Sequence, residues 1–184
     1  MERIFIGIPI AGNAHKIIDG LIRPIGKSTR DIRWVPRQNR HLTLAFPGLR
    51  PGSEIIRLIN LFDQTYQLQL PFQLRFTAFE RFPDPNSRLV ALTGPVTEPL
   101  QQLLQVTRDL INVSRVEIEA KEFRPHITLG RIRRGKNSYP AIDQQTDITV
   151  KVSSVVLYQS TLTETGSVYR HLKESRLGRQ KAVK

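Results

Sequence analysis

His41-Leu42-Thr43-Leu44 and His126-Ile127-Thr128-Leu129 are two copies of one four-residue pattern: histidine, aliphatic residue, threonine, leucine. The chain has four histidines, so half of them stand in this pattern. Side chains two positions apart on a β-strand point to the same face of the sheet. We therefore expect each histidine to share a face with the threonine of its own copy, while the aliphatic residues pack on the opposite face.

Two imidazoles and two hydroxyls that face one another suit the cleavage of a phosphodiester without a metal. A neutral imidazole removes a proton from the attacking water or hydroxyl, and an imidazolium gives a proton to the leaving oxygen. An unperturbed histidine pKa of about 6.5 allows both forms near neutral pH. The hydroxyls and a nearby arginine can bind the phosphate oxygens on which charge accumulates. In the alternative interpretation these side chains only satisfy each other's hydrogen bonds, but the repetition of the pattern favours the functional one.

Alternating apolar residues around the motifs predict a sheet with helices interspersed. Strands are expected near residues 3–10, 32–35, 40–46, 72–78, 88–93, 126–129, 147–158 and 167–172. Apolar residues at helical spacing predict helices over about 13–24, 53–62 and 97–111, the first ending near Pro24. This order favours an α+β fold with a mainly antiparallel sheet. No linker divides the chain, so we expect one domain over residues 1–172 and a loose basic tail over 173–184.

Composition narrows the classes of function. The 28 lysines and arginines exceed the 16 aspartates and glutamates and give a net charge of +12, which favours a polyanionic partner, with nucleic acid ahead of a membrane. The absence of cysteine excludes disulfides, cysteine-ligated zinc, iron–sulfur clusters and thiol catalysis. The sequence has no acidic cluster that would hold magnesium and no histidine pair at zinc spacing, so we expect neither a metal nor another cofactor.

The N-terminal apolar stretch predicts a strand rather than a targeting segment. It is short and is interrupted by Gly7 and Pro9. No apolar run approaches the roughly 20 residues that a transmembrane helix needs. We therefore expect a cytoplasmic protein that does not insert into a membrane.

The two motifs and their flanks resemble those of the RNA 2′,3′-cyclic phosphodiesterases, also called 2′-5′ RNA ligases (LigT-like), of the two-histidine phosphoesterase superfamily. The second copy stands in Phe123-Arg124-Pro125-His126-Ile127-Thr128-Leu129-Gly130-Arg131, which is very similar to the family's form. The sequence departs from the family at Gln38-Asn39-Arg40, where Glu-Asn-Leu is common, and at Ala45-Phe46-Pro47-Gly48. The resemblance implies a bilobed α+β fold in which two antiparallel sheets face a central cleft with helices outside.

The resemblance also implies a reaction and a role for each motif residue. A terminal 2′,3′-cyclic phosphate would be hydrolysed to a 2′-phosphate, and the reverse reaction would join RNA ends by a 2′-5′ bond without ATP. His41 would be the proton donor to the departing 3′ oxygen, and His126 would be the acceptor of a proton from water. Thr43, Thr128 and Arg131 would bind the phosphate.

Other residues are candidates for contact with RNA. Trp34 and Phe46 can stack on a base or belong to the core. The basic residues Arg133, Arg134 and Lys136 follow the second motif and can contact the RNA backbone. The expected partner is RNA that ends in a 2′,3′-cyclic phosphate, with tRNA fragments among the candidates, and the expected state is a monomer.

Two alternative functions stay open at this point. One is a phosphodiesterase acting on small cyclic nucleotides or 2′-5′ oligonucleotides, which the charge of +12 disfavours. The other is a non-catalytic module that binds RNA ends. The complete histidine–threonine pairs argue against the second, because a module that only binds needs arginines and backbone amides more than titratable histidines.

Overall fold

A computed structural model describes the chain except for residues 29–30, 119–121, 134–141, 165 and 179–184. The described part contains helices α1 (Ala14–Ser28), α2 (Gly52–Tyr66) and α3 (Glu98–Val113) and the short 3-10 helix η1 (Arg37–Asn39). Its strands are β1 (Glu2–Pro9), β2 (Ile32–Trp34), β3 (His41–Arg50), β4 (Phe72–Phe82), β5 (Leu89–Thr93), β6 (His126–Ile132), β7 (Asp143–Val152), β8 (Ser154–Thr163) and β9 (Gly166–Arg176). None of the described helices is long and apolar enough to cross a membrane.

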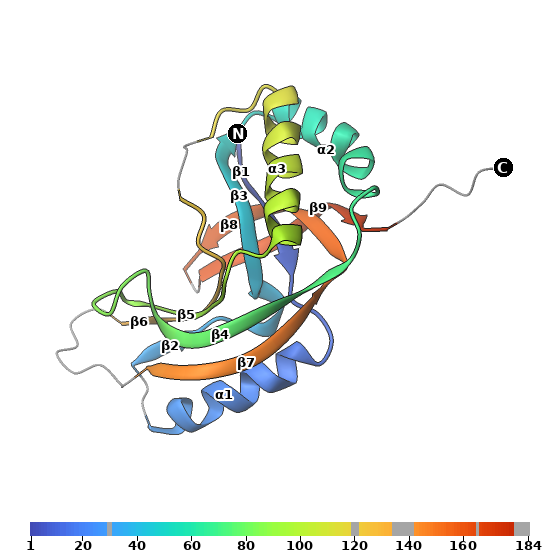
Figure 1. Cartoon of the computed structure of the whole chain (residues 1–184). Helices are drawn as coiled ribbons and strands as arrows, with labels where there is room; N and C mark the ends of the chain where they lie inside the picture. The colour runs from blue at the N-terminus through green and yellow to red at the C-terminus, as the bar shows by residue number, and fades with distance from the viewer. Residues whose placement is uncertain (29–30, 119–121, 134–141, 165, 179–184) are drawn as a thin grey trace.

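The strands form two antiparallel halves that meet between the two motifs. The strand order is β7-β4-β5-β6-β3-β1-β8-β9, and β2 pairs with β6. Between β6 and β3, the recorded register is a single pair, Leu42 with Ile127. The predicted α+β fold with antiparallel pairing is thus confirmed, and the described strands form one nine-stranded sheet whose two halves join through the second residue of each motif. Helix α1 lies along β7, and α2 and α3 cover the other half (Figure 1).

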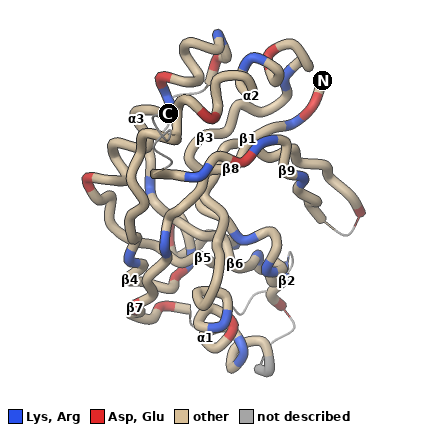
Figure 2. Tube along the Cα trace, turned by 90° about the vertical axis from the view of Figure 1, so that its right-hand side faces the viewer, with Lys and Arg blue, Asp and Glu red and all other residues tan. Residues whose placement is uncertain are grey.

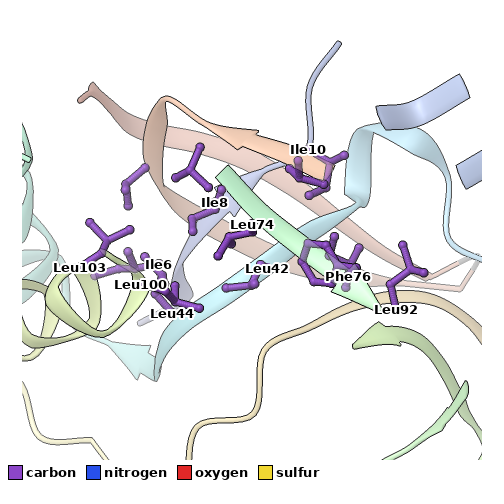
Figure 3. Packing of buried hydrophobic residues seen from close by; sticks show 14 of the residues in the cluster. Ile6, Ile8, Ile10, Leu42, Leu44, Leu74, Phe76, Leu92, Leu100 and Leu103 are labelled. Atoms are coloured by element: carbon purple, nitrogen blue, oxygen red, sulfur yellow. The ribbon is translucent and has the colours of Figure 1, made fainter. Parts of the chain in front are cut away.

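The core explains why the motif strands keep this orientation. Leu42 and Ile127 are 1% and 0% exposed, and Leu44 and Leu129 are also buried, whereas the motif histidines and threonines are mostly buried but reach the surface. Leu42 and Leu44 pack in one cluster with alternate residues of β1 and with Leu74 and Phe76 of β4 (Figure 3). Burial of one such side chain contributes about 1.5–3 kcal/mol. A slip by one residue would expose these side chains, so the core fixes the register.

Several element boundaries differ from those predicted. The single strand expected over 147–158 is two strands, because β7 ends at Val152 and β8 begins at Ser154. Pro24 lies inside α1, which continues to Ser28, because Ile25 beyond it is still buried in the core. The expected tail at 173–184 begins too early, since β9 runs through Arg176. Residues 173–176 pair with β8, and Ser175 and Leu177 are buried. Residues 179–184 of the predicted tail lie outside the described residues.

Candidate active site

The four motif side chains lie on one face where the two halves of the sheet meet. In an antiparallel pair centred on Leu42 and Ile127, the flanking positions place His41 opposite Thr128 and Thr43 opposite His126. Each histidine is thus next to the threonine of its own copy along the strand and next to that of the other copy across it. The sequence alone predicts the first of these relations, whereas the second depends on the register that the fold provides.

A cavity of about 620 Å³ opens on this face. Among the residues predicted from the sequence, its walls include His41, Thr43, Thr128, Arg131, Trp34 and Phe46. Further walls come from β1, β2, η1 and the β8–β9 hairpin, and they include Phe5, Arg33, Asn39, Ser160, Ser167 and Tyr169. His126 does not line this cavity, but the positive charge of its protonated form lowers the pKa of His41.

The backbone fixes the proton position on both imidazole rings in the same way. Nδ1 of His41 lies 2.8 Å from the carbonyl oxygen of Asn39, and Nδ1 of His126 lies 2.8 Å from that of Arg124. In both copies the carbonyl belongs to the residue two positions before the histidine. A carbonyl oxygen can only accept, so each neutral ring carries its proton on Nδ1 and keeps a lone pair on Nε2. The two rings therefore present the same nitrogen for proton transfer.

Aromatic rings hold both imidazoles in place. The centroid of the Phe5 ring lies 4.6 Å from that of His41, and the Phe82 centroid lies 4.1 Å from that of His126. Tyr169 adds an edge contact to His41, with centroids 5.3 Å apart. These contacts limit rotation of the rings, so that Nε2 keeps a defined direction.

The electrostatics of the two histidines differ from the expectation of unperturbed groups. The pKa of His41 is lowered to about 4, and burial of the ring is the main cause. The Asn39 carbonyl opposes this shift, and the positive charge of the protonated form of His126 adds to it. Burial also lowers the pKa of His126; the Arg124 carbonyl opposes this and the Arg124 guanidinium adds to it. Both rings are therefore neutral at pH 7 in the free protein. A bound phosphate anion would raise both pKa values, because it stabilises the imidazolium form.

Arginines and an indole line one side of the cavity. Arg33 and Arg131 are neighbours across the β2–β6 pair, and Trp34 is paired with Gly130. A Cβ at position 130 would lie 2.9 Å from Cε3 of Trp34, so glycine is needed for the indole to lie across β6. Trp34 also packs against the core, so it has both a place in the core and a place at the cavity. Figure 2 shows Lys and Arg positions in the region where β2 and β6 lie.

The β8–β9 hairpin closes another side of the cavity. Nδ2 of Asn39 donates to the carbonyl oxygen of Ser167 over 2.8 Å, which ties the tip of the hairpin to η1. Asn39 is also the residue whose carbonyl accepts from His41. Reasoning from the sequence did not name Phe5, Arg33, Asn39, Phe82 or Tyr169 as site residues.

The remaining predicted RNA contacts have different positions. Phe46 is 51% exposed at the cavity, and the guanidinium of Arg3 lies over its ring at 5.4 Å from the centroid. Arg133 is exposed just after β6 and does not line the cavity. Arg134 and Lys136 lie outside the described residues. Within the described ranges, no three His, Cys, Asp or Glu side chains are grouped as a metal site requires.

Comparisons with known proteins find similarity in both sequence and fold. Residues 20–164 match the model of the 2′-5′ RNA ligase superfamily. Two curated relatives, each named RNA 2′,3′-cyclic phosphodiesterase, come from Thermotoga maritima and Aeropyrum pernix. The first is 28% identical, over 94% of this chain and 94% of the relative. The second is 30% identical, over 78% of this chain and 85% of the relative.

Solved structures extend the similarity to the backbone. TT0787 of Thermus thermophilus is 25% identical and superposes with a TM-score of 0.79 over 96% of this chain and 98% of that one. Escherichia coli LigT in complex with 3′-AMP, also 25% identical, superposes with a TM-score of 0.76 over 97% of this chain and 99% of that one.

Proposed function

Since the chain belongs to the 2′-5′ RNA ligase superfamily, we propose that it is an RNA 2′,3′-cyclic phosphodiesterase that opens a terminal cyclic phosphate to a 2′-phosphate. One observation carries the proposal. The pair formed by Leu42 and Ile127 brings two histidines with equivalent tautomers and two threonines onto one face, beside a cavity lined by arginine. Two curated relatives are named for this activity, and the matched region covers most of the length of each relative.

The reaction needs one proton acceptor and one proton donor. Nε2 of His126 takes a proton from a water molecule, whose oxygen attacks phosphorus. The bond from phosphorus to the 3′ oxygen breaks, and that oxygen receives a proton from Nε2 of the His41 imidazolium. The products are a 3′-hydroxyl and a 2′-phosphate, and exchange with solvent restores the two protonation states.

The threonines and Arg131 supply the complementary charge. Thr43 and Thr128 stand between the two histidines and can donate to the non-bridging phosphate oxygens, on which negative charge grows in the transition state. Arg131 lines the same cavity and adds a positive charge beside the phosphate. No metal is needed for this step, because each charge that develops is met by a side chain.

The bound substrate also prepares the proton donor. His41 is neutral in the free protein, since burial holds its pKa at about 4. The phosphate anion next to the ring raises that pKa and favours protonation of His41 in the complex. Protonation is thereby linked to the presence of a phosphate, which explains how a buried histidine serves as an acid.

The charge distribution supports RNA as the substrate rather than a small cyclic nucleotide. Arg33 and Arg131 line the cavity, and Arg133 continues the basic series beyond the end of β6. These cations would meet the phosphates that precede the terminal one along a strand.

The proposal has three further parts. We propose that the enzyme is monomeric and cytoplasmic, that its single domain includes the end of β9, and that tRNA fragments are among its substrates.

The direct test uses an RNA oligonucleotide that ends in a 2′,3′-cyclic phosphate, incubated in excess EDTA. We expect quantitative conversion to the 2′-phosphate, with the position of the phosphate determined by NMR or by selective phosphatase treatment. The same oligonucleotide with a linear 3′-phosphate is the control and should stay intact. A 3′-phosphate product, or turnover only after a divalent metal is added, would contradict the proposal.

A further inference from the structure

A second cavity, of about 400 Å³, lies on the β5 side of β6, opposite the edge at which β2 and β3 pair, and His126 is not among its lining residues. Its walls come from β4, β5 and the segment that leads into β6, and they include Glu80, Phe82, Thr93, Glu122 and Arg124. Phe82 is the residue that stacks on the His126 ring, and Thr93 is the Cα partner of His126 across β5 and β6. The cavity therefore begins next to the proposed proton acceptor. We call it the acidic pocket.

Strand register places the polar groups of this pocket in a row beside His126. Directly paired residues of antiparallel strands point to the same face, so Thr93 shares the face of His126. The hydroxyl of Thr93 donates to Oε1 of Glu80 over 2.7 Å. A carboxylate only accepts, so the Thr93 proton is committed to Glu80, and the lone pairs of its oxygen remain available. Thr93 thus offers an acceptor, not a donor, on the face of the sheet that His126 occupies.

The two cavities that flank the motifs have opposite charge. The walls of the first contain Arg33 and Arg131 and no carboxylate among the described residues. The acidic pocket has two carboxylates, Glu80 and Glu122, and one cation, Arg124. The Arg124 guanidinium is already engaged, because it donates to the carbonyl oxygen of Pro83 and lies 4.8 Å from the centroid of the Phe82 ring. A phosphate is therefore favoured in the first cavity and disfavoured in the second.

We propose that the nucleophile enters through the acidic pocket and that Glu80 and Glu122 select water against the 5′ end of a second RNA strand. The inference rests on the proposed function, in which His126 activates the nucleophile. An entering water gives one hydrogen to Nε2 of His126 and directs the other to the oxygen of Thr93, and its own oxygen attacks phosphorus. The 5′-hydroxyl of an RNA brings a phosphate one nucleotide away, and this phosphate meets the two carboxylates. The protein therefore hydrolyses cyclic ends and disfavours ligation.

The test measures how the wild-type chain divides its cyclic-phosphate substrate between two nucleophiles. RNA ending in a 2′,3′-cyclic phosphate is incubated at low salt with an excess of a 5′-hydroxyl oligonucleotide, and ligated and hydrolysed products are counted. Glu80→Gln keeps an acceptor for the Thr93 hydroxyl and removes the charge, and Glu122→Gln changes an exposed side chain. We expect the double variant to raise the ratio of ligated to hydrolysed product by about three- to tenfold, and added salt to reduce the gain.

Two controls make the outcome specific. Asp109→Asn, on the exposed face of α3 near its C-terminal end, removes a charge that does not line the pocket and should leave the ratio unchanged. Glycerol in place of the oligonucleotide is an uncharged nucleophile, so its share of product should be the same in the wild type and in the double variant. An unchanged ligation ratio, or an equal gain with glycerol, would overturn the inference. Failure of the proposed function would look different, since the wild type would then not open the cyclic phosphate at all.

Discussion

On β3, the His41 ring contacts the rings of Phe5 and Tyr169, and burial lowers its pKa to about 4. On β6, the His126 ring stacks on Phe82 alone among the described aromatic rings, and Phe82 lines a pocket with two carboxylates. Each of the two histidines has a backbone carbonyl at Nδ1, the same tautomer and a threonine two positions further along its strand. The repeated sequence motif therefore provides two equivalent proton-transfer groups, and the surrounding fold gives each group a different role.

Removal of either imidazole should have the largest effect. His41→Ala and His126→Ala should each lower kcat about 10²–10⁴-fold, because each proton transfer contributes that much. In the double variant the fold-loss of kcat should be much smaller than the product of the two single losses, since the histidines act as a unit.

The matched control is His171→Ala, which removes an exposed histidine of β9 and should leave turnover near that of the wild type. Circular dichroism and thermal unfolding would verify that the variants fold. Near-normal turnover in either motif variant would remove that histidine from the mechanism.

Loss of a threonine hydroxyl should have a smaller effect that is similar in the two halves. Thr43→Val and Thr128→Val each remove one donor to the phosphate, and we expect kcat to fall by about tenfold or more. Thr65→Val, whose hydroxyl bonds to the Leu61 carbonyl within α2, is the control. A large loss in one threonine variant and none in the other would show that the phosphate is held by one half of the site only.

The sequence predicts the symmetric part of this site and little of the asymmetric part. A two-residue period is a local property of a strand, so the burial of Leu42 and Ile127 and the shared face of each histidine and threonine follow from the pattern alone. The partners Phe5 and Tyr169 reach His41 only through the pairing of β1 with β3 and the course of β9. The lowered pKa of His41 depends on that packing, so the expectation of an unperturbed value is wrong for this ring.

Local rules also fail where tertiary contacts outweigh them. Proline usually ends or kinks a helix, but α1 continues past Pro24, and the burial of Ile25 accompanies that continuation. The end of β9 has the composition of a polar tail, but its pairing with β8 and the burial of Leu177 extend the strand. Such contacts join distant parts of the chain and leave no mark in a short window of sequence.

The pH dependence should reveal how the two halves depend on the substrate. Both histidine pKa values in the free protein are lowered from 6.5, so kcat/KM should be highest below pH 6.5 and should fall as pH rises, because the proton donor loses its proton. The bound phosphate raises the pKa of His41, so kcat should begin to fall at a higher pH than kcat/KM does. A kcat/KM that rises between about pH 6.5 and 8 would be inconsistent with the lowered values.

The effect of salt on the basic side of the site should be the smallest. The ratio of kcat/KM for an oligonucleotide to that for a mononucleotide should exceed one at low salt and decrease as salt rises. The logarithm of this ratio, plotted against the logarithm of salt concentration, should have a slope of about −0.7 per phosphate contact. Substitution of Arg133, Arg134 and Lys136 by glutamine should reduce this ratio, whereas Arg131→Gln should slow both substrates alike. Arg108→Gln, on the exposed face of α3, is the control. Equal efficiency at every salt concentration would favour small cyclic nucleotides as substrates.

The most direct measurement of the division of work between the two histidines uses an RNA end in which sulfur replaces the 3′ oxygen of the cyclic phosphate. A thiolate leaves without a proton, so this substrate no longer needs a proton donor but still needs an activated water. We predict that His41→Ala regains turnover near that of the wild type on the sulfur substrate, while His126→Ala stays as impaired as it is on the natural one. Rescue of His126→Ala instead, or equal behaviour of the two variants, would contradict the assignment of His41 as proton donor and His126 as acceptor.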